Sequence, residues 1–187
     1  MSTLVLASRS PQRRAILQQL GVPFVERPAD VTEEEAGDPE AVAVQNARRK
    51  ALAAGANEGE VVLGVDTLVA VEHEIWGKPP DADAATRTLQ ALSGRTHVVV
   101  SGVALLPGGG ELQAATARTR VTFRELDDAL VQWYVASGEW RGRAGGYAIQ
   151  GRGAALVKRI DGDYLNVVGL PVATLIDLWP GLLDLAA

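Results

Sequence analysis

The sequence predicts an α/β fold built on a mixed sheet. Strand and helix signals alternate along the 187 residues, which is typical of α/β architecture. Two long segments with strand character, 96–106 and 111–123, are joined by Pro107-Gly108-Gly109-Gly110, which is typical of a turn between antiparallel strands. Because a Rossmann fold is mostly parallel, this hairpin favours a mixed sheet over a Rossmann fold.

The expected strands are separated by glycine, proline or charged residues. Residues 61–65 form a continuous apolar run, which is typical of a strand buried on both faces. Residues 67–71 and 75–76 flank His73-Glu74, and we expect them to form a hairpin. The expected strands cover residues 3–7, 23–27, 61–65, 67–71, 75–76, 96–106, 111–123 and 154–160.

The expected helices are marked by capping residues and by helical spacing of apolar side chains. Ser10 suits the N-cap of the first helix, Pro11 its first position and Gly21 its end. Asp38-Pro39 begins the second helix in the same way. The expected helices cover residues 11–21, 38–54, 82–92, 127–137 and 171–178, and the glycine-rich segment 142–153 is expected to be a loop.

Composition limits the classes of protein that this chain can belong to. A length of 187 residues with 47% hydrophobic residues fits one globular domain over 1–187. The net charge of −5 argues against a nucleic-acid partner, and the absence of cysteine excludes disulfides, thiolate zinc sites and cysteine nucleophiles. Residues 3–7 are too short an apolar run for a signal peptide or membrane span. We therefore expect a cytoplasmic protein without a membrane partner.

The first predicted helix carries two arginines where cations are disfavoured. Arg13 and Arg14 follow Pro11 and fall in the first turn, at the positive end of the helix dipole. Together with the free N–H groups of that turn, they indicate a site for an anion such as phosphate. The alternative is a capped helix whose arginines bend away into water.

Asp66 is the strongest candidate for chemistry. It follows the buried run 61–65 directly, and a carboxylate there is costly unless it is paired, bound to metal or open to a cleft. The alternative is an aspartate that caps a turn with Thr67.

A second set of charged residues suits a polyphosphate with a divalent metal. Glu33, in the acidic stretch 30–40, supplies a second carboxylate, and Mg²⁺ or Mn²⁺ prefers such oxygen ligands. Lys78 lies between Gly77 and Pro79, so its backbone is restricted. Lys50, Lys78 and Arg13 together can surround phosphates. The alternatives are a solvated acidic loop and, for Lys50, an ordinary charged helix face.

Six motifs follow one another along nearly the whole chain. They are Leu6-Ala7-Ser8-Arg9-Ser10-Pro11 with Arg13, Gly64-Val65-Asp66-Thr67, Gly77-Lys78-Pro79, Leu92-Ser93-Gly94-Arg95-Thr96-His97, Ala144-Gly145-Gly146-Tyr147-Ala148-Ile149-Gln150-Gly151 and Asn166-Val167-Val168-Gly169-Leu170-Pro171. In this order they resemble the Maf family of nucleoside triphosphate pyrophosphatases.

The resemblance implies a fold, a reaction and a set of site residues. The implied fold is an elongated mixed sheet flanked by helices, with two lobes around a central cleft, related to inosine triphosphatases. The implied reaction splits a nucleoside triphosphate between the α and β phosphates, with a divalent metal, Mg²⁺ or Mn²⁺, as cofactor. Asp66 matches the proton acceptor, and Glu33 and Asp66 match the metal ligands. The residues expected to bind substrate and its phosphates are Ser8, Ser10, Arg13, Lys50 and Lys78.

The resemblance also bears on specificity and on biological role. Gln150, within its motif, is similar to the branch that acts on dTTP and UTP, and Thr67 is expected to help read the nucleoside. That branch usually carries arginine where this chain has Gln12, a position linked to substrate selection. A homodimer is common in the family. The competing hypothesis is a nucleotide-sensing regulator of septum formation that has no significant catalysis.

Overall fold

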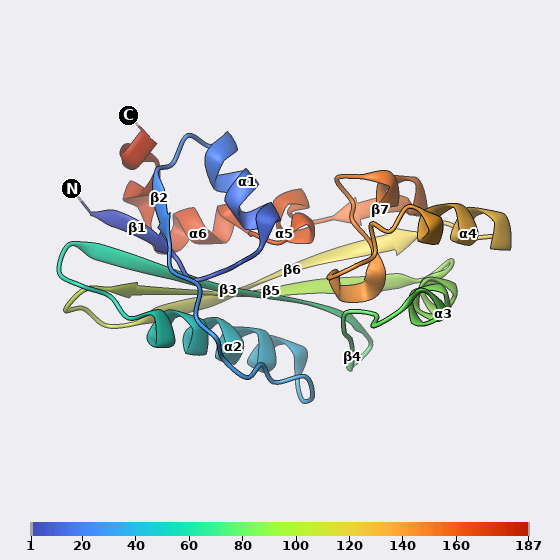
Figure 1. The fold of residues 1–187 in the computed structure, drawn as a ribbon, viewed down its shortest axis with the longest axis horizontal. Helices are drawn as coiled ribbons and strands as arrows, with labels where there is room; N and C mark the ends of the chain where they lie inside the picture. The colour runs from blue at the N-terminus through green and yellow to red at the C-terminus, as the bar shows by residue number, and fades with distance from the viewer. Residues whose placement is uncertain (1, 187) are drawn as a thin grey trace.

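The computed structural model, which describes residues 2–186, confirms an α/β fold with a mixed sheet (Figure 1). Its strands are β1 (Thr3–Leu6), β2 (Phe24–Glu26), β3 (Glu60–Val71), β4 (Glu74–Trp76), β5 (Thr96–Pro107), β6 (Gln113–Phe123) and β7 (Val157–Asp161). They form one seven-stranded sheet in the order β2-β1-β3-β5-β6-β7, with β4 beside β3. The pairs β1–β2 and β1–β3 are parallel, and the other strand pairs are antiparallel.

Helices cover both faces of this long sheet and one of its ends. They are α1 (Pro11–Gln19), α2 (Pro39–Ala54), α3 (Ala82–Leu92), α4 (Asp128–Ala136), α5 (Tyr164–Val168) and α6 (Val172–Leu178), with the 3₁₀ segments η1 (Ala144–Gly146), η2 (Arg152–Leu156) and η3 (Pro180–Ala186). Figure 1 shows α2 on one face, α1, α5 and α6 on the other, and α3 and α4 at one end. No helix within residues 2–186 is long and apolar enough to cross a membrane.

Two main hydrophobic cores lie at different ends of the sheet. One packs β1, β3 and β5 against α1 and α6, with Leu6, Leu17 and Leu175 fully buried. The other packs the far ends of β3, β5 and β6 against α3, α4 and the segment around Tyr147. A smaller cluster lies between the sheet and α2. This arrangement gives an elongated molecule with a separate core in each half.

The longest strand differs from the prediction in a way that matters for function. β3 runs unbroken from Glu60 to Val71, so Asp66 lies within a strand opposite Gly102, and the prediction that the strand ends at Val65 was wrong. The apolar and β-branched residues after Asp66 continue the strand, and partners from α2 satisfy its buried carboxylate.

The edge of β3 is open at its middle. β1 pairs with Glu60–Leu63 and β4 pairs with Val69–Val71 on the edge away from β5. Within the described residues, 64–68 have no strand partner on that edge. Because side chains alternate along a strand, Asp66 and Thr67 point to opposite faces at this opening.

Other boundaries also differ from the predictions. The strand expected from residue 154 begins at Val157, because Arg152–Leu156 form the 3₁₀ segment η2. The strand expected from residue 111 begins at Gln113. The sequence patterns did not reveal α5, a five-residue helix that begins after Asp163, whose carboxylate accepts a hydrogen bond from the N–H of Leu165.

Two glycines allow α2 to approach the sheet closely. A Cβ atom added to Gly64 would lie 2.1 Å from the carbonyl oxygen of Ala47, and one added to Gly102 would lie 2.2 Å from that of Ala43. The backbone of α2 therefore lies directly on β3 and β5, which brings its side chains to the carboxylate of Asp66.

A buried aromatic cluster stabilises the other core. His97 is fully buried, and its ring packs edge-on against Phe123 and Tyr147 at centroid distances of 4.9 and 5.4 Å. Its Nε2 atom lies 2.8 Å from the hydroxyl of Tyr147. Burial lowers the pKa of His97 to about 4, so the imidazole is neutral at pH 7.

We predict that Gly64→Ala lowers the free energy of unfolding by about 2–3 kcal/mol, because the added methyl group collides with the α2 backbone. Urea denaturation measures the change. Gly77→Ala is the control, since a Cβ there meets no heavy atom within 4 Å. Equal midpoints for the two variants would contradict the close packing of α2.

We predict that His97 makes the fold sensitive to acid. An unfolded histidine takes up a proton near pH 6.5, whereas the folded one does so near pH 4. The contribution of His97 to the free energy of unfolding is therefore complete above pH 6.5. It falls by about 3 kcal/mol as the pH is lowered to 4. Urea denaturation across this range should show the loss in the wild type and a smaller one in His97→Phe. Parallel pH profiles would refute this assignment.

Candidate active site

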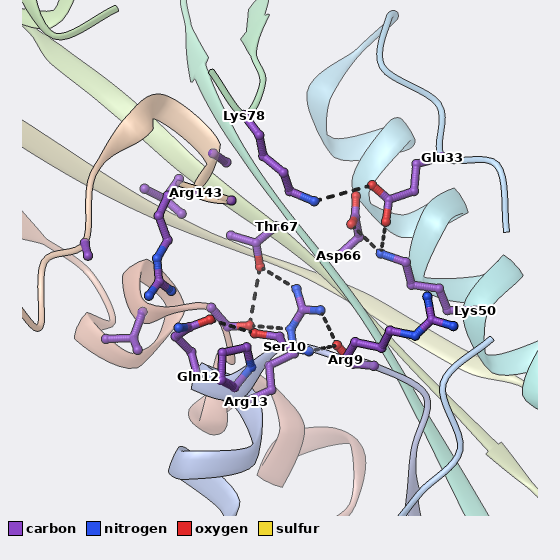
Figure 2. Close-up of a pocket in the computed structure, with 18 of the residues that line it drawn as sticks. Arg9, Ser10, Gln12, Arg13, Glu33, Lys50, Asp66, Thr67, Lys78 and Arg143 are labelled. Carbon is purple, nitrogen blue, oxygen red and sulfur yellow. Dashed lines mark hydrogen bonds and ion pairs between the residues drawn. The ribbon is translucent and has the colours of Figure 1, made fainter. Parts of the chain in front are cut away.

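A pocket of about 470 Å³ opens at the unpaired middle of β3 (Figure 2). Its walls come from the β1–α1 loop, the loop at residues 28–33, the loop at 142–150 and the segment 167–169. The predicted site residues all line this one pocket: Ser8, Ser10, Gln12, Arg13, Glu33, Lys50, Asp66, Thr67, Lys78 and Gln150. The fold therefore brings together residues that are spread over most of the sequence.

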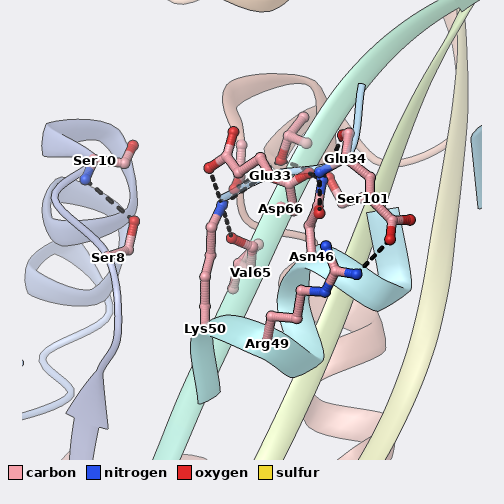
Figure 3. A network of polar contacts seen from close by, with 12 residues as sticks. Ser8, Ser10, Glu33, Glu34, Asn46, Arg49, Lys50, Val65, Asp66 and Ser101 are labelled. Atoms are coloured by element: carbon pink, nitrogen blue, oxygen red, sulfur yellow. Dashed lines mark hydrogen bonds and ion pairs between the residues drawn. The ribbon is translucent and has the colours of Figure 1, made fainter. Parts of the chain in front are cut away.

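The carboxylate of Asp66 is held at both oxygens by side chains of α2. Lys50 Nζ lies 2.7 Å from Oδ1 of Asp66, and Asn46 Nδ2 donates to Oδ2 at 3.0 Å (Figure 3). Asp66 is 5% exposed and Lys50 is 8% exposed. The alternatives of a turn-capping aspartate and of an ordinary surface lysine were therefore wrong.

Lys50 also contacts the second carboxylate. Its Nζ atom lies 2.6 Å from Oε1 of Glu33, so one ammonium group bridges the two acids. Lys78 Nζ lies 4.0 Å from Oε2 of the same glutamate, and its side chain is more than half exposed. The acidic loop is thus folded over the end of the pocket that holds Asp66.

Arg13 lies deep in the pocket and is held by three partners. It donates to the carbonyl oxygen of Gly169 at 2.9 Å, to Ser8 Oγ at 2.8 Å and to Thr67 Oγ1 at 3.2 Å. Desolvation lowers the pKa of Arg13, while the carboxylates of Asp66 and Glu33 oppose this shift. A guanidinium fixed in this way presents its positive charge to the pocket without large rearrangement.

The side chains of the two arginines in the first helical turn point in different directions. Arg13 turns inward, as the anion-site prediction requires, whereas Arg14 extends to Glu26 at 3.3 Å on the surface. The prediction that both arginines serve the same site was therefore wrong for Arg14.

The N-terminus of α1 is not capped by a side chain. Ser10 occupies the N-cap position, but its hydroxyl contacts Gln12 Oε1 at 3.0 Å, so the predicted side-chain cap was wrong. Ser8 Oγ instead accepts from the backbone N–H of Ser10 at 3.2 Å. Helix N-termini have N–H groups without intrahelical acceptors, and an anion in the pocket can use them.

Three polar side chains in or next to the pocket were not predicted from the sequence. Arg143 and Arg9 line the pocket, the first from the loop before η1 and the second from the β1–α1 loop (Figure 2). Asn46 lies behind Asp66 and lies one turn before Lys50 on α2. The four-residue spacing of Asn46 and Lys50 places them on one face of the helix, which is the signal that could have revealed Asn46.

The pocket offers carboxylate oxygens for a divalent cation. Oε1 of Glu33 and Oδ1 of Asp66 both contact the Nζ atom of Lys50, so the two carboxylates lie close to each other with the ammonium group between these oxygens. Within residues 2–186 no group of three or more His, Cys, Asp or Glu side chains is placed to hold a metal. Two carboxylates are enough for Mg²⁺ when phosphates and water complete its coordination, so this donor set fits such an ion.

Comparison with known proteins relates the chain to one family. It is 48% identical to the dTTP/UTP pyrophosphatase of Moorella thermoacetica over 185 residues, which cover 95% of this chain and 94% of that protein. It is 41% identical to the dTTP/UTP pyrophosphatase of Pyrococcus furiosus over 181 residues, again 95% and 94% of the two chains.

Solved structures are more distantly similar. A nucleoside-triphosphatase (dITP/XTP pyrophosphatase) from Mycobacterium abscessus is 22% identical, with a TM-score of 0.45 over 66% of this chain and 75% of that one. A HAM1 protein from Coxiella burnetii is 21% identical, with a TM-score of 0.48 over 66% and 73% of the two chains.

The family model described as Maf-like protein matches residues 3–180, which is nearly the whole chain. Together with the 41–48% identity to relatives over 94% of their length, this match establishes that the chain belongs to the Maf family.

Proposed function

We propose that this protein is a nucleoside triphosphate pyrophosphatase that converts dTTP or UTP, or modified forms of them, into the monophosphate and pyrophosphate. The observation that supports the proposal is that a buried carboxylate, Asp66, and a buried arginine, Arg13, line the same pocket. The chain that carries this pocket is 41–48% identical to proteins named dTTP/UTP pyrophosphatase. Removal of such nucleotides from the cellular pool would be its role.

Asp66 is proposed as the general base. Its carboxylate orients a water molecule and accepts a proton from it as the water oxygen bonds to the α-phosphorus. The bond from the α-phosphorus to the bridging oxygen breaks, and the electron pair leaves with pyrophosphate. The donors Lys50 and Asn46 hold the carboxylate so that it needs little reorganisation during this step.

The cationic side chains of the pocket are proposed to bind the phosphates. Arg13 and Lys78 offset negative charge on the transferring and leaving groups, and Lys50 balances the carboxylates beside them. Ser8 and Ser10 add hydroxyl groups at the start of α1. The free N–H groups of that helix turn supply further donors.

A divalent metal, Mg²⁺ or Mn²⁺, is proposed to be held by Glu33 and Asp66 together with the phosphates. When bound, such an ion neutralises phosphate charge and polarises the phosphoryl oxygens. Lys50 contributes an ammonium group between the same two acids.

Gln12, Thr67 and Gln150 are proposed to select the nucleoside. All three line the pocket, and Oε1 of Gln12 lies 3.0 Å from the hydroxyl of Ser10 at the start of α1. An amide can donate and accept hydrogen bonds at once, which suits the edge of a pyrimidine base.

The wider assignments are proposals too. We propose that residues 1–187 act as one Maf-like domain in a cytoplasmic homodimer, which light scattering on the purified protein would test. The enzyme names of the relatives favour catalysis over the septum-regulator hypothesis.

We predict rapid pyrophosphate release from dTTP and UTP in a panel that also holds CTP, the purine triphosphates and 7-methyl-GTP. Asp66→Asn should lower kcat by about 100- to 10,000-fold, because the amide cannot accept the proton. Circular dichroism checks that the variant is folded. Activity on another nucleotide would change the assigned substrate and leave the proposed mechanism in place. Nucleotide binding without release of pyrophosphate would favour the regulator hypothesis.

We predict that EDTA abolishes turnover and that Mg²⁺ or Mn²⁺ restores it. Glu33→Gln should raise the metal concentration needed for half-maximal rate about tenfold or more, because one carboxylate ligand is lost. Glu35→Gln, an exposed neighbour outside the pocket lining, is the control. The same metal dependence in both variants would remove Glu33 from the metal site.

A further inference from the structure

Asn46 connects the two acidic parts of the pocket through a single buried side chain. It is fully buried, and it makes three hydrogen bonds (Figure 3). Its Oδ1 accepts from the backbone N–H of Glu34 at 2.8 Å, and its Nδ2 donates to the carbonyl oxygen of Glu34 at 2.9 Å. The third bond runs from Nδ2 to Oδ2 of Asp66 at 3.0 Å.

The chemistry of these three bonds requires an amide. The two hydrogens of Nδ2 serve two acceptors, and Oδ1 serves one donor, so the side chain is matched to its surroundings. Turning the amide over would set Oδ1 against a carbonyl oxygen and a carboxylate, which repel it. A carboxylate, a hydroxyl or an apolar group of the same size cannot replace all three contacts.

Asn46 and Lys50 bind different oxygens of the same carboxylate. The lysine, one turn later, binds Oδ1 of Asp66, and the asparagine binds Oδ2. Two donors at different oxygens fix the plane of the carboxylate as well as its position. The bonds to the backbone of Glu34 also fix the chain directly after Glu33.

We propose that Asn46 is a positioning residue that holds the Asp66 carboxylate and the Glu33 segment in a fixed relation for catalysis. The inference rests on the proposed function, because it assigns Asn46 to the same site. Asn46 acts through its neighbours: it does not line the pocket, and Asp66 and Glu33 do. Loss of the amide would free one oxygen of Asp66 and remove the side-chain partner from both the N–H and the carbonyl oxygen of the half-buried Glu34.

Arg49 provides a matched control on the same helix. It contacts the Glu34 carboxylate and donates to the carbonyl oxygen of Thr32 at 3.4 Å, so it also anchors the acidic loop to α2. Its polar partners in the described part of the chain are Glu34 and Thr32 rather than Asp66, and it is partly exposed. Arg49→Leu therefore removes a loop anchor and leaves the carboxylate of Asp66 in place.

The test compares Asn46→Leu with Arg49→Leu. For Asn46→Leu we expect kcat on the preferred triphosphate to fall about 10- to 100-fold, with KM changed by less than about threefold, because Arg13 and the other phosphate contacts stay. For Arg49→Leu we expect kcat within about threefold of the wild type, since exposed ion pairs contribute little. Titration with an α,β-methylene nucleotide counts the competent sites, so that partial unfolding cannot imitate a loss of kcat.

A second measurement does not depend on turnover. Hydrogen–deuterium exchange at the backbone N–H of Glu34 should become faster in Asn46→Leu, because that N–H loses its acceptor. Binding of Mn²⁺ in the presence of the methylene nucleotide, followed by electron paramagnetic resonance, should weaken about tenfold. Should Asn46→Leu not fold, Asn46→Ala removes the amide without adding a charge beside Asp66, and the same loss of kcat is expected because both donors are gone.

The outcomes separate this inference from the proposed function. A wild type that is active on a triphosphate, with Asn46→Leu and Asn46→Ala within about threefold of Arg49→Leu, would overturn the inference alone. A proportional loss of competent sites and of rate would also overturn it, because Asn46 would then serve only stability. A wild type that releases no pyrophosphate from any triphosphate would overturn the proposed function, and the inference with it.

Discussion

The structure depends on the burial of a charged carboxylate in the middle of a β-strand. Asp66 is almost inaccessible to solvent, and a buried charge is costly unless it is paired and hydrogen-bonded. Lys50 and Asn46 meet this requirement from α2. They reach Asp66 because α2 lies directly on the sheet, and Gly64 is one of the residues that allow this approach. The close packing of α2 on the sheet therefore also supplies the partners that stabilise the buried carboxylate of Asp66.

The pocket itself follows from the arrangement of the strands. β1 ends and β4 begins on the same edge of β3, so the stretch between them is free of strand pairing within the described residues. Side chains of both faces of the sheet reach the opening there, Asp66 from one and Thr67 from the other. Arg13 closes the arrangement, since it joins the start of α1 to Thr67 and to the carbonyl oxygen of Gly169.

The charges in the pocket are divided between two sides. The acids Glu33 and Asp66 lie together around Lys50, and Arg13 lies by the start of α1 (Figure 2). A triphosphate with a divalent cation is complementary to this arrangement, because the carboxylates suit the cation and Arg13 suits the phosphates. The match explains how a chain with a net charge of −5 can have a pocket suited to an anionic substrate.

The sequence by itself determined the mixed α/β class, most element positions and ten of the residues that line the pocket. The spacing of apolar residues fixes which side chains share one face of a helix or strand, and capping residues mark where a helix begins and ends. Both are local properties of the sequence. The family motifs identified Ser8, Asp66, Lys78 and Gln150 as site residues, and all of them line the pocket. Only the tertiary structure decided that β3 continues through Asp66, that Arg14 turns away and that Asn46 joins the acidic loop to the strand. Such contacts join residues far apart in the chain, and they depend on how closely the elements pack, which no local pattern encodes.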